Sequence, residues 1–227
     1  MDYELKYLEL NPTLHQEDCK RKVKEILSIL PKDLQITTLL DYGCGGGFIL
    51  KELVKYLDLE KAVGVDISTE VISLAKRHND NNRIQFITCD EFEFSPYQDF
   101  DCLLLIDLLE HLQCPIKILE KLRNRSNLII VRVPLEDTFS NYIFALFGKN
   151  HFERTEKQYG HIHHFTLDNV LNLIEQSGYT LREFSIFPLP LIQSRFFYYL
   201  QLVCWFLIPR QLYAQIFGGF VVCLASN

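Results

Sequence analysis

Short apolar runs alternate with amphipathic stretches along the first 133 residues of the chain. The runs have the length and composition of strands, and they lie at 37–40, 62–65, 84–88, 101–106 and 127–133. Between them, apolar residues recur at helical spacing, which predicts helices over 12–30, 48–57, 69–78 and 115–125. Strands that alternate with helices in this way are typical of a parallel sheet covered on both faces. The expected fold class is therefore α/β, with a doubly wound and mostly parallel sheet.

The alternation breaks at residues 134–165, where Phe, Tyr, Gly and His residues are mixed. A connection of this length inside a compact domain usually has a functional role, so we expect a cap or lid. The pattern then resumes with a helix over 167–176, a strand over 181–187, a helix over 191–207 and a last strand over 217–225. We expect one domain over 1–227, with a helical segment at 1–35, a cap insertion at 134–165 and an apolar helical segment at 188–209.

A glycine-rich loop with the sequence DYGCGGG, residues 41–47, separates the first predicted strand from the next helix. Glycines let the backbone turn sharply and let a ligand lie against the main chain. A helix N-terminus alone suits an anion, but the carboxylate of Asp41 repels a pyrophosphate and attracts a cation. Dinucleotide-binding loops also have a third glycine where this chain has Phe48. The loop therefore disfavours a nicotinamide cofactor.

Two further acids follow the next two predicted strands. Asp66 ends the second strand, 21 residues after Gly45, where a carboxylate can accept both hydroxyls of a ribose. Asp90 follows the third strand, where a carboxylate can accept a hydrogen bond from the exocyclic amine of adenine. The carboxyl ends of parallel strands are where open α/β sheets bind their ligands. The three acids together therefore predict a nucleoside-containing ligand at this edge.

Four stretches, DYGCGGG, VGVDIS, TCD and LLLIDLLEHL, resemble the successive motifs of class I S-adenosylmethionine-dependent methyltransferases. The later stretch GHIHHFT, at 160–166, resembles a segment common in the small-molecule branch of that family. The resemblance covers residues 37–187 and implies a seven-stranded sheet whose last strand runs antiparallel to the others. It also implies S-adenosylmethionine as cofactor, a sulfonium cation without phosphate, which suits a glycine loop flanked by an acid.

The resemblance assigns a role to each cofactor-binding position. Asp41 and the loop residues would hold the methionine end of the cofactor, and Asp66 would accept the ribose hydroxyls. Ile67 would pack on the adenine, Asp90 would meet the adenine amine, and Asp107 would lie near the methyl group. The implied cofactor residues are Asp41, Gly43, Cys44, Gly45, Gly47, Asp66, Ile67, Asp90 and Asp107.

Methyl transfer from a sulfonium is an in-line displacement, so the protein mainly has to position the nucleophile and exclude water. An oxygen or nitrogen nucleophile also needs a base in many cases. Four of the seven histidines, at 151, 161, 163 and 164, lie in the predicted cap, and His111 follows the fourth strand. We take His111 and His164 as the candidate bases.

Asp107, Glu110 and His111 allow two interpretations. In the first, which we adopt, they shape the pocket and the protein has no resident metal. In the second, the pattern is similar to the metal-binding acid-x-x-Glu-His of ubiquinone-biosynthesis O-methyltransferases. It also resembles the metal site of small-RNA 3′-terminal 2′-O-methyltransferases, where a later histidine completes the set. The alternative metal set is Asp107, Glu110, His111 and His161, with His164 as a substitute for His161.

The net charge of −6 and the lack of a basic stripe disfavour binding to nucleic acid. We therefore predict transfer of a methyl group to a small molecule, with oxygen as the acceptor atom. A metal-dependent RNA 2′-O-methyltransferase is one alternative. A partner subunit that binds the cofactor without transferring a methyl group is the other.

Residues 184–227 carry only two charged side chains, Arg195 and Arg210. We expect the apolar segment within them to pack over the sheet or to form a homodimer surface, and a peripheral membrane contact through 191–209 is the alternative. Its longest apolar run, at 196–209, is too short to cross a bilayer. The seven cysteines form no CxxC pair, and the first residues show no signal-peptide pattern. Both features predict a cytoplasmic protein with free thiols.

Overall fold

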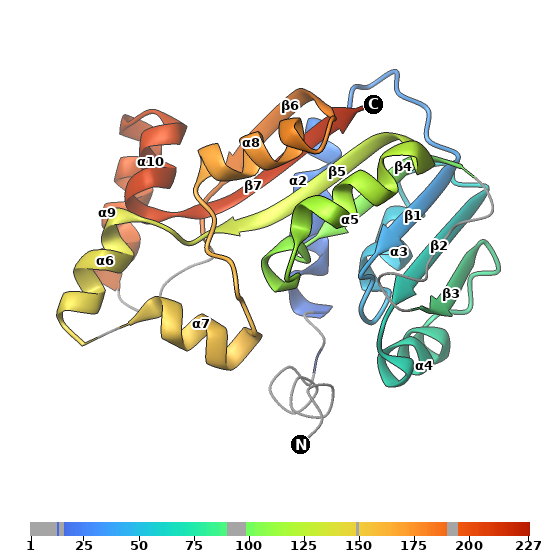
Figure 1. Cartoon of the computed structure of the whole chain (residues 1–227), viewed down its shortest axis with the longest axis horizontal. Helices are drawn as coiled ribbons and strands as arrows, with labels where there is room; N and C mark the ends of the chain where they lie inside the picture. Colours follow the sequence, from blue (N-terminus) through green and yellow to red (C-terminus); the bar gives the residue numbers. More distant parts are fainter. Residues whose placement is uncertain (1–12, 14–15, 90–98, 149, 190–194) are drawn as a thin grey trace.

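Seven strands form one sheet in the computed structural model, which describes residues 13, 16–89, 99–148, 150–189 and 195–227 (Figure 1). The strand order is β3-β2-β1-β4-β5-β7-β6. β7 pairs antiparallel with both of its neighbours, and the other neighbouring strands pair parallel. The doubly wound fold with an antiparallel last strand is thus confirmed. The strands are β1 (Thr38–Tyr42), β2 (Lys61–Asp66), β3 (Ile84–Thr88), β4 (Phe100–Ile106), β5 (Ser126–Leu135), β6 (Thr180–Phe187) and β7 (Gly219–Ser226).

Helices cover both faces of this sheet and gather at one end of it (Figure 1). The α-helices are α2 (Cys19–Ile29), α3 (Phe48–Leu53), α4 (Thr69–His78), α5 (Pro115–Leu122), α6 (Phe139–Leu146), α7 (His151–Tyr159), α8 (Leu167–Gln176), α9 (Arg195–Leu207) and α10 (Arg210–Phe217). Three short 3-10 helices are η1 (Gln16–Asp18), η2 (Leu109–His111) and η3 (Arg123–Arg125).

Two apolar cores, one on each face, hold the helices against the sheet. Residues of α2, α3 and α4, among them Ile26, Leu50 and Ile72, pack on one face. Residues of α5, α8 and α10 pack on the other, with Ile118 and Val170 fully buried. β4 and β5 are buried on both faces, which explains why their sequences are almost continuously apolar. The carboxyl ends of β1, β2 and β4 therefore lie together on a rigid layer.

The helix boundaries follow local sequence where a cap fixes them. α4 and α8 span the predicted residues, and the side chains of Ser68 and Thr166 accept hydrogen bonds from the backbone in their first turns. Several predicted extents were wrong. In the helix expected over 12–30, residues 12, 14 and 15 lie outside the described residues, and the α-helix begins at Cys19, after the turn of η1. The helices expected over 48–57 and 115–125 end at Leu53 and Leu122, and the strand expected over 217–225 begins at Gly219 because α10 extends to Phe217. α10 was not predicted from the sequence.

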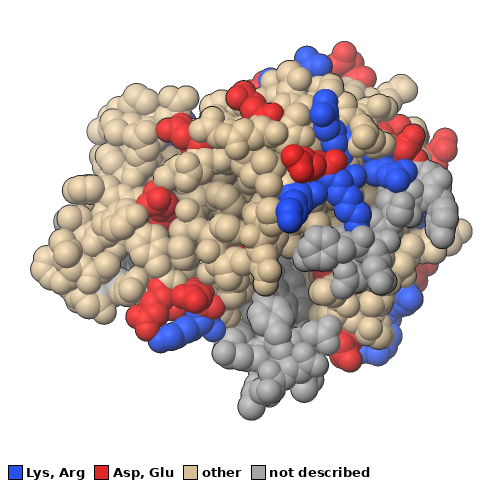
Figure 2. All heavy atoms as spheres, viewed as in Figure 1, with Lys and Arg blue, Asp and Glu red and all other residues tan. Residues whose placement is uncertain are grey.

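The stretch between β5 and α8, which holds α6 and α7, lies at the same end of the molecule as α9 and α10 (Figure 1). α6, the residue after it and α9 leave large apolar side chains exposed, among them Leu146 (81%), Phe147 (77%), Phe206 (73%) and Leu207 (77%). In the view of Figure 2 this end is mostly tan, with a cluster of red and blue groups at its lower edge. Within the described ranges, no helix combines the length and the apolar character that crossing a membrane requires.

Candidate active site

The glycine loop at the end of β1 requires glycine at three positions. Gly43, Gly45 and Gly47 have φ angles of 82°, 52° and 73°, in the left-handed region that other residues rarely adopt. A Cβ atom on Gly47 would lie 2.4 Å from the ring of Phe86, so this glycine also allows close packing of loop and sheet. The amides of Gly43 and Cys44 both donate to the carbonyl of Val65, at 2.8 and 2.9 Å. The loop is therefore tied to the end of β2.

The carboxylate of Asp66 lies between the two loops that follow β1 and β2. Its Oδ2 accepts a hydrogen bond from the amide of Gly45 at 2.9 Å, and its Oδ1 accepts one from the amide of Ser68 at 3.0 Å. Burial raises the pKa of Asp66, although these amide hydrogen bonds oppose the shift. A carboxylate has more lone-pair positions than two amides occupy, so Asp66 can still accept hydrogen bonds from a ligand hydroxyl.

Asp41 is a buried acid at the end of β1. Its side chain is 1% exposed, and its Oδ2 has no hydrogen-bond partner among the described residues. Burial, and then the charge of Asp66, raise the pKa of Asp41 to about 7. Because a buried carboxylate is costly unless it is paired, the position suits a ligand that brings a positive charge.

A cavity of about 100 Å³ opens beside this acid. It is lined by the glycine loop, the ends of β1 and β4, and two residues of α2: Cys19, Lys22, Asp41, Gly43, Cys44, Gly45, Gly46, Phe48, Ile49, Ile106 and Asp107. Ile67, just after β2, is 60% exposed, so its apolar side chain is accessible to a ligand. Asp90, the predicted partner of the adenine amine, lies outside the described residues.

Asp107 is held by two cations. It has a φ of 52°, the only positive φ of a non-glycine residue in the described part of the chain. Its carboxylate pairs with Lys22 Nζ of α2 at 2.8 Å and with the guanidinium of Arg132 of β5. Burial alone would raise the pKa of Asp107, but Arg132 and then Lys22 hold it well below its usual range. The residue lines the cavity, yet its charge is already neutralised.

Arg132 was not singled out from the sequence. It is fully buried, its Nε donates to Glu25 Oε2 at 2.7 Å, and its guanidinium lies 3.8 Å from the ring centre of Phe220. The sequence does carry one sign of this network: Arg132 is a single cation within the apolar run of β5, and a cation in a buried strand almost always has an acidic partner. The network links α2, β4 and β5 beneath the cavity.

Glu110 and His111 lie on η2, three and four residues after Asp107. Glu110 is 1% exposed, and its Oε2 has no partner among the described residues. Burial, and then the charge of Asp107, raise the pKa of Glu110 well above its usual value. The Nδ1 of His111 is 3.3 Å from the carbonyl of Gly160. Burial, together with His161, lowers the pKa of His111 to about 4, so its ring is neutral at pH 7.

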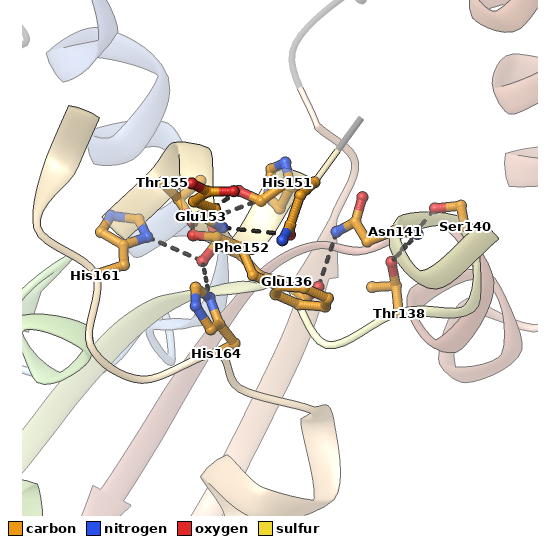
Figure 3. Close-up of polar contacts among 11 residues, drawn as sticks. Glu136, Thr138, Ser140, Asn141, His151, Phe152, Glu153, Thr155, His161 and His164 are labelled. Carbon is orange, nitrogen blue, oxygen red and sulfur yellow. Dashed lines mark hydrogen bonds and ion pairs between the residues drawn. The ribbon is translucent and has the colours of Figure 1, made fainter. Parts of the chain in front are cut away.

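Glu136, directly after β5, gathers three histidines of the following segment (Figure 3). Its Oε2 lies 2.9 Å from His161 Nδ1 and 2.9 Å from His164 Nδ1, and its Oε1 lies 3.3 Å from His151 Nε2. Burial alone would raise the pKa of Glu136, but the hydrogen bonds from His151 and His161 hold it well below its usual range. We call Glu136, His151, His161 and His164 the Glu136 cluster.

Glu136 was not predicted as a site residue. The histidines stand out in the sequence as a group, but a single acid after an apolar strand looks like an ordinary loop residue. The candidate bases differ in their surroundings: the structure places His164 in the Glu136 cluster, and His111 against a backbone carbonyl. The rings of His111 and His161 meet edge to face, with centres 4.9 Å apart, so the two groups adjoin.

Three of the four residues in the alternative metal set come together. One ligand atom each from Glu110, His111 and His161 lies within 4.8 Å of the others. This donor set, with the unpartnered Glu110 Oε2, has the chemistry that a divalent transition metal accepts. Asp107 is not in the group, since Lys22 and Arg132 engage its carboxylate.

The fold and the arrangement of loop and acids define a class I S-adenosylmethionine-dependent methyltransferase. Residues 14–183 match the family described as "Methyltransferase domain". The chain belongs to this family, and S-adenosylmethionine is its cofactor. The nicotinamide cofactor disfavoured by Phe48 and Asp41 has no support here.

Several known proteins are similar to the chain. Ubiquinone biosynthesis O-methyltransferase of Pelagibacter ubique (strain HTCC1062) is 29% identical over 122 residues, which are 52% of this chain and 50% of that protein. The chain thus spans about half the length of this curated relative. Among solved structures, the methyltransferase in complex with the Haloferax volcanii Trm112 methyltransferase activator has a TM-score of 0.68 at 15% identity, over 97% of this chain and 96% of that one. Magnesium protoporphyrin IX methyltransferase from Synechocystis PCC 6803, with bound SAH, has a TM-score of 0.60 at 14% identity, over 100% and 88%.

Proposed function

We propose that the protein transfers a methyl group from S-adenosylmethionine to an oxygen atom of a small molecule. The observation that carries the proposal is the buried carboxylate of Asp41 beside the glycine loop, whose Oδ2 has no hydrogen-bond partner in the described part of the chain. S-adenosylmethionine supplies an electrophilic methyl group on a sulfonium, and its methionine end carries an ammonium group. Asp41 and the loop would hold that end, Asp66 would accept the ribose hydroxyls, and Ile67 would pack on the adenine. The relative named for ubiquinone biosynthesis O-methylation supports oxygen as the acceptor atom.

We propose His164 rather than His111 as the base that receives the proton of the acceptor hydroxyl. The Nδ1 of His164 faces the carboxylate of Glu136, so in the neutral ring Nδ1 carries the hydrogen and Nε2 the lone pair. The low pKa of about 4 makes His111 a poor proton acceptor. His111 would instead shape the pocket beside His161.

A metal-assisted version of the same transfer is the second candidate, and the trio of Glu110, His111 and His161 favours it. A divalent ion held there would polarise the acceptor oxygen and lower the pKa of its hydroxyl. The RNA version of this chemistry has less support, because the chain has a net charge of −6.

Calorimetry with S-adenosylhomocysteine and with NAD tests the cofactor class. We expect binding of the first and none of the second, and the reverse result would overturn the proposal. A screen of phenols, catechols, carboxylic acids and amines, with homocysteine release as the readout, then tests the acceptor class. Parallel wells with a chelator separate the metal-free mechanism from the metal-assisted one. Transfer only to amines, or to none of the classes, would contradict the assignment of an oxygen acceptor.

We further propose that the exposed apolar face of α6 and α9 is covered by a second copy of the chain. α6 and α9 both pack against α10, and α9 leaves Phe206 and Leu207 exposed. The sequence left packing over the sheet and a homodimer surface open for this segment. Exposed apolar side chains that gather on one part of a surface mark association sites. Sedimentation of the intact chain and of Phe206→Ser tests this, with a dimer expected only for the first. A monomer that floats with liposomes would favour the membrane contact instead.

A further inference from the structure

We propose that Glu136 is a positioning residue that fixes the Nδ1-protonated tautomer of both His161 and His164 and so sets the acceptor side of the site. The inference on the tautomers stands on the geometry alone. Its consequence for methyl transfer rests on the proposed function.

The carboxylate of Glu136 decides which ring nitrogens carry hydrogen. An ionised carboxylate only accepts hydrogen bonds, so each ring nitrogen that faces it must carry a hydrogen. Both His161 and His164 direct Nδ1 at the same atom, Oε2 of Glu136, at 2.9 Å. In the neutral rings, Nδ1 is therefore protonated and Nε2 carries the lone pair. The tautomer of each ring is thus imposed by one atom.

The backbone holds Glu136 and the two histidines in register. The amide of Glu136 donates to the carbonyl of Phe165 at 3.1 Å, and Leu135 forms a parallel bridge with Phe165. Between the two histidines, the amides of Ile162 and His163 donate to the carbonyl of Glu110 at 2.9 and 3.1 Å. Backbone hydrogen bonds to Glu110 and Glu136 therefore hold the segment 161–165 in place, and this fixes where the side chains of His161 and His164 meet Glu136.

His151 brings a third element into the Glu136 cluster. It is the first residue of α7, and its Nε2 approaches the other oxygen of Glu136 (Figure 3). The ring of Phe152, the next residue, meets the ring of His164 with centres 4.9 Å apart. One carboxylate thus joins the end of β5, the start of α7 and the segment that carries His161 and His164.

A substitution that removes the charge but keeps the shape distinguishes positioning from simple packing. In Glu136→Gln, the side-chain amide has one accepting oxygen and one donating nitrogen. Because both rings face the one atom Oε2, the amide oxygen can take its place and accept from both, with the amide nitrogen turned toward His151. Glu136→Gln therefore tests the charge alone. Glu136→Leu has no acceptor and tests the tautomers, so in that variant we expect at least one of the two rings to change to the Nε2-protonated tautomer. Glu136→Asp keeps a carboxylate and should preserve both tautomers.

The test uses NMR of the full chain with ¹⁵N-labelled histidine at about pH 8, above the ordinary histidine pKa. The variants His161→Gln and His164→Gln assign the ring signals. The wild type should show a protonated Nδ1 in both rings, and an unprotonated Nδ1 in either ring overturns the proposal. This measurement decides the matter even if Glu136→Leu fails to fold.

If Glu136→Leu folds, unchanged tautomers in both rings also overturn the proposal. Glu153→Gln is the matched control. Glu153 lies on α7, as His151 does, but it is exposed and pairs with Lys157. It should leave both histidine tautomers unchanged.

The consequence for transfer has its own readout. Glu136 does not line the cofactor cavity, so Glu136→Leu should keep the affinity for S-adenosylhomocysteine within about twofold. With an acceptor from the screen, kcat should fall about 10- to 100-fold, as is usual when a supporting partner of a site histidine is lost. An unchanged kcat would show that the tautomers do not serve transfer. Failure of the wild type to bind S-adenosylhomocysteine would sink the proposed function but leave the tautomer result standing.

Discussion

Asp66 and Gly45 are joined by a hydrogen bond of 2.9 Å between the carboxylate of the first and the backbone amide of the second. Gly45 lies in the loop after β1, and Asp66 is the last residue of the neighbouring parallel strand β2. This one hydrogen bond therefore fixes the ends of the two strands relative to each other. Because the amide of Ser68 holds the other oxygen at 3.0 Å, the carboxylate has a set orientation before any ligand arrives. Preorganisation of this kind lowers the ordering cost of binding.

Asp66→Ala should abolish tight binding of S-adenosylhomocysteine. Two hydrogen bonds from ribose hydroxyls to a charged group, at about 1.5–3 kcal/mol each, correspond to a loss of at least about 100-fold in affinity. The increase in melting temperature that a ligand produces should vanish with the affinity. Calorimetry and thermal shift measure both, with Asp58→Ala, an exposed acid after α3, as the control. Wild-type protection in Asp66→Ala would remove this residue from the site.

A pair of glycine substitutions separates backbone strain from loss of ligand contact. Gly45 and Gly148 both have a positive φ, 52° and 73°, and neither has a described atom within 4 Å of an added Cβ. Alanine at either position should therefore cost a similar free energy of folding, about 1 kcal/mol. Only Gly45 lines the cavity. We expect Gly45→Ala to lose S-adenosylhomocysteine binding at least about tenfold and Gly148→Ala to keep it.

Calorimetry on both variants, after denaturant unfolding has shown equal stability, makes this comparison. If Gly148→Ala weakened binding of S-adenosylhomocysteine as much as Gly45→Ala does, the loss of affinity would come from backbone strain and not from a ligand contact of the glycine loop.

The parts of the site that local sequence encodes were predictable. The glycine loop needs glycine at fixed positions because of its φ angles, and Ser68 caps α4 within the same stretch of chain, so both leave a local pattern. The acids at strand ends follow from the alternation of strands and helices. Ile67 and Asp66 could be placed for the same reason.

Contacts between distant segments could not be predicted in this way. Glu136 meets His161 and His164 across 25 and 28 residues, and Arg132 meets Glu25 across 107. No spacing rule relates such positions, since the fold alone brings them together. Asp107 shows the consequence: its place after β4 was expected, but its pairing with Lys22 and Arg132 depends on where α2 docks.

Binding of S-adenosylhomocysteine should tighten as the pH rises from about 6 to 8. The pKa of Asp41 is raised to about 7, so most of this carboxyl is protonated at pH 6 and most is ionised at pH 8. Only the ionised form pairs with the ammonium of the ligand, and the ionised fraction grows about tenfold over this range. Calorimetry at several pH values measures the change. Asp41→Asn should bind weakly with no such dependence, and an equal pH dependence in that variant would exclude Asp41 as its source.

Arg132→Met should destabilise the fold by about 3–5 kcal/mol, because it leaves the buried carboxylates of Glu25 and Asp107 without their shared cation. Denaturant unfolding measures this, with Arg77→Met, on the exposed side of α4, expected to stay within about 0.5 kcal/mol of the wild type. Adding Asp107→Asn should recover part of the loss, since it removes one of the two carboxylates that Arg132 neutralises. Equal stability of Arg132→Met and Arg77→Met would show that the network contributes nothing.

The same network predicts how stability depends on acid. The pKa of Asp107 is lower in the fold than in the unfolded chain, so the unfolded chain binds more protons as the pH falls. The stabilisation by Asp107 is therefore complete above the ordinary Asp pKa of about 4 and is lost progressively below it. Unfolding free energies measured downward from about pH 5 should fall more steeply for the wild type than for Arg132→Met, in which the cation that lowers this pKa is missing. Parallel curves for the two proteins would mean that Arg132 does not act on Asp107.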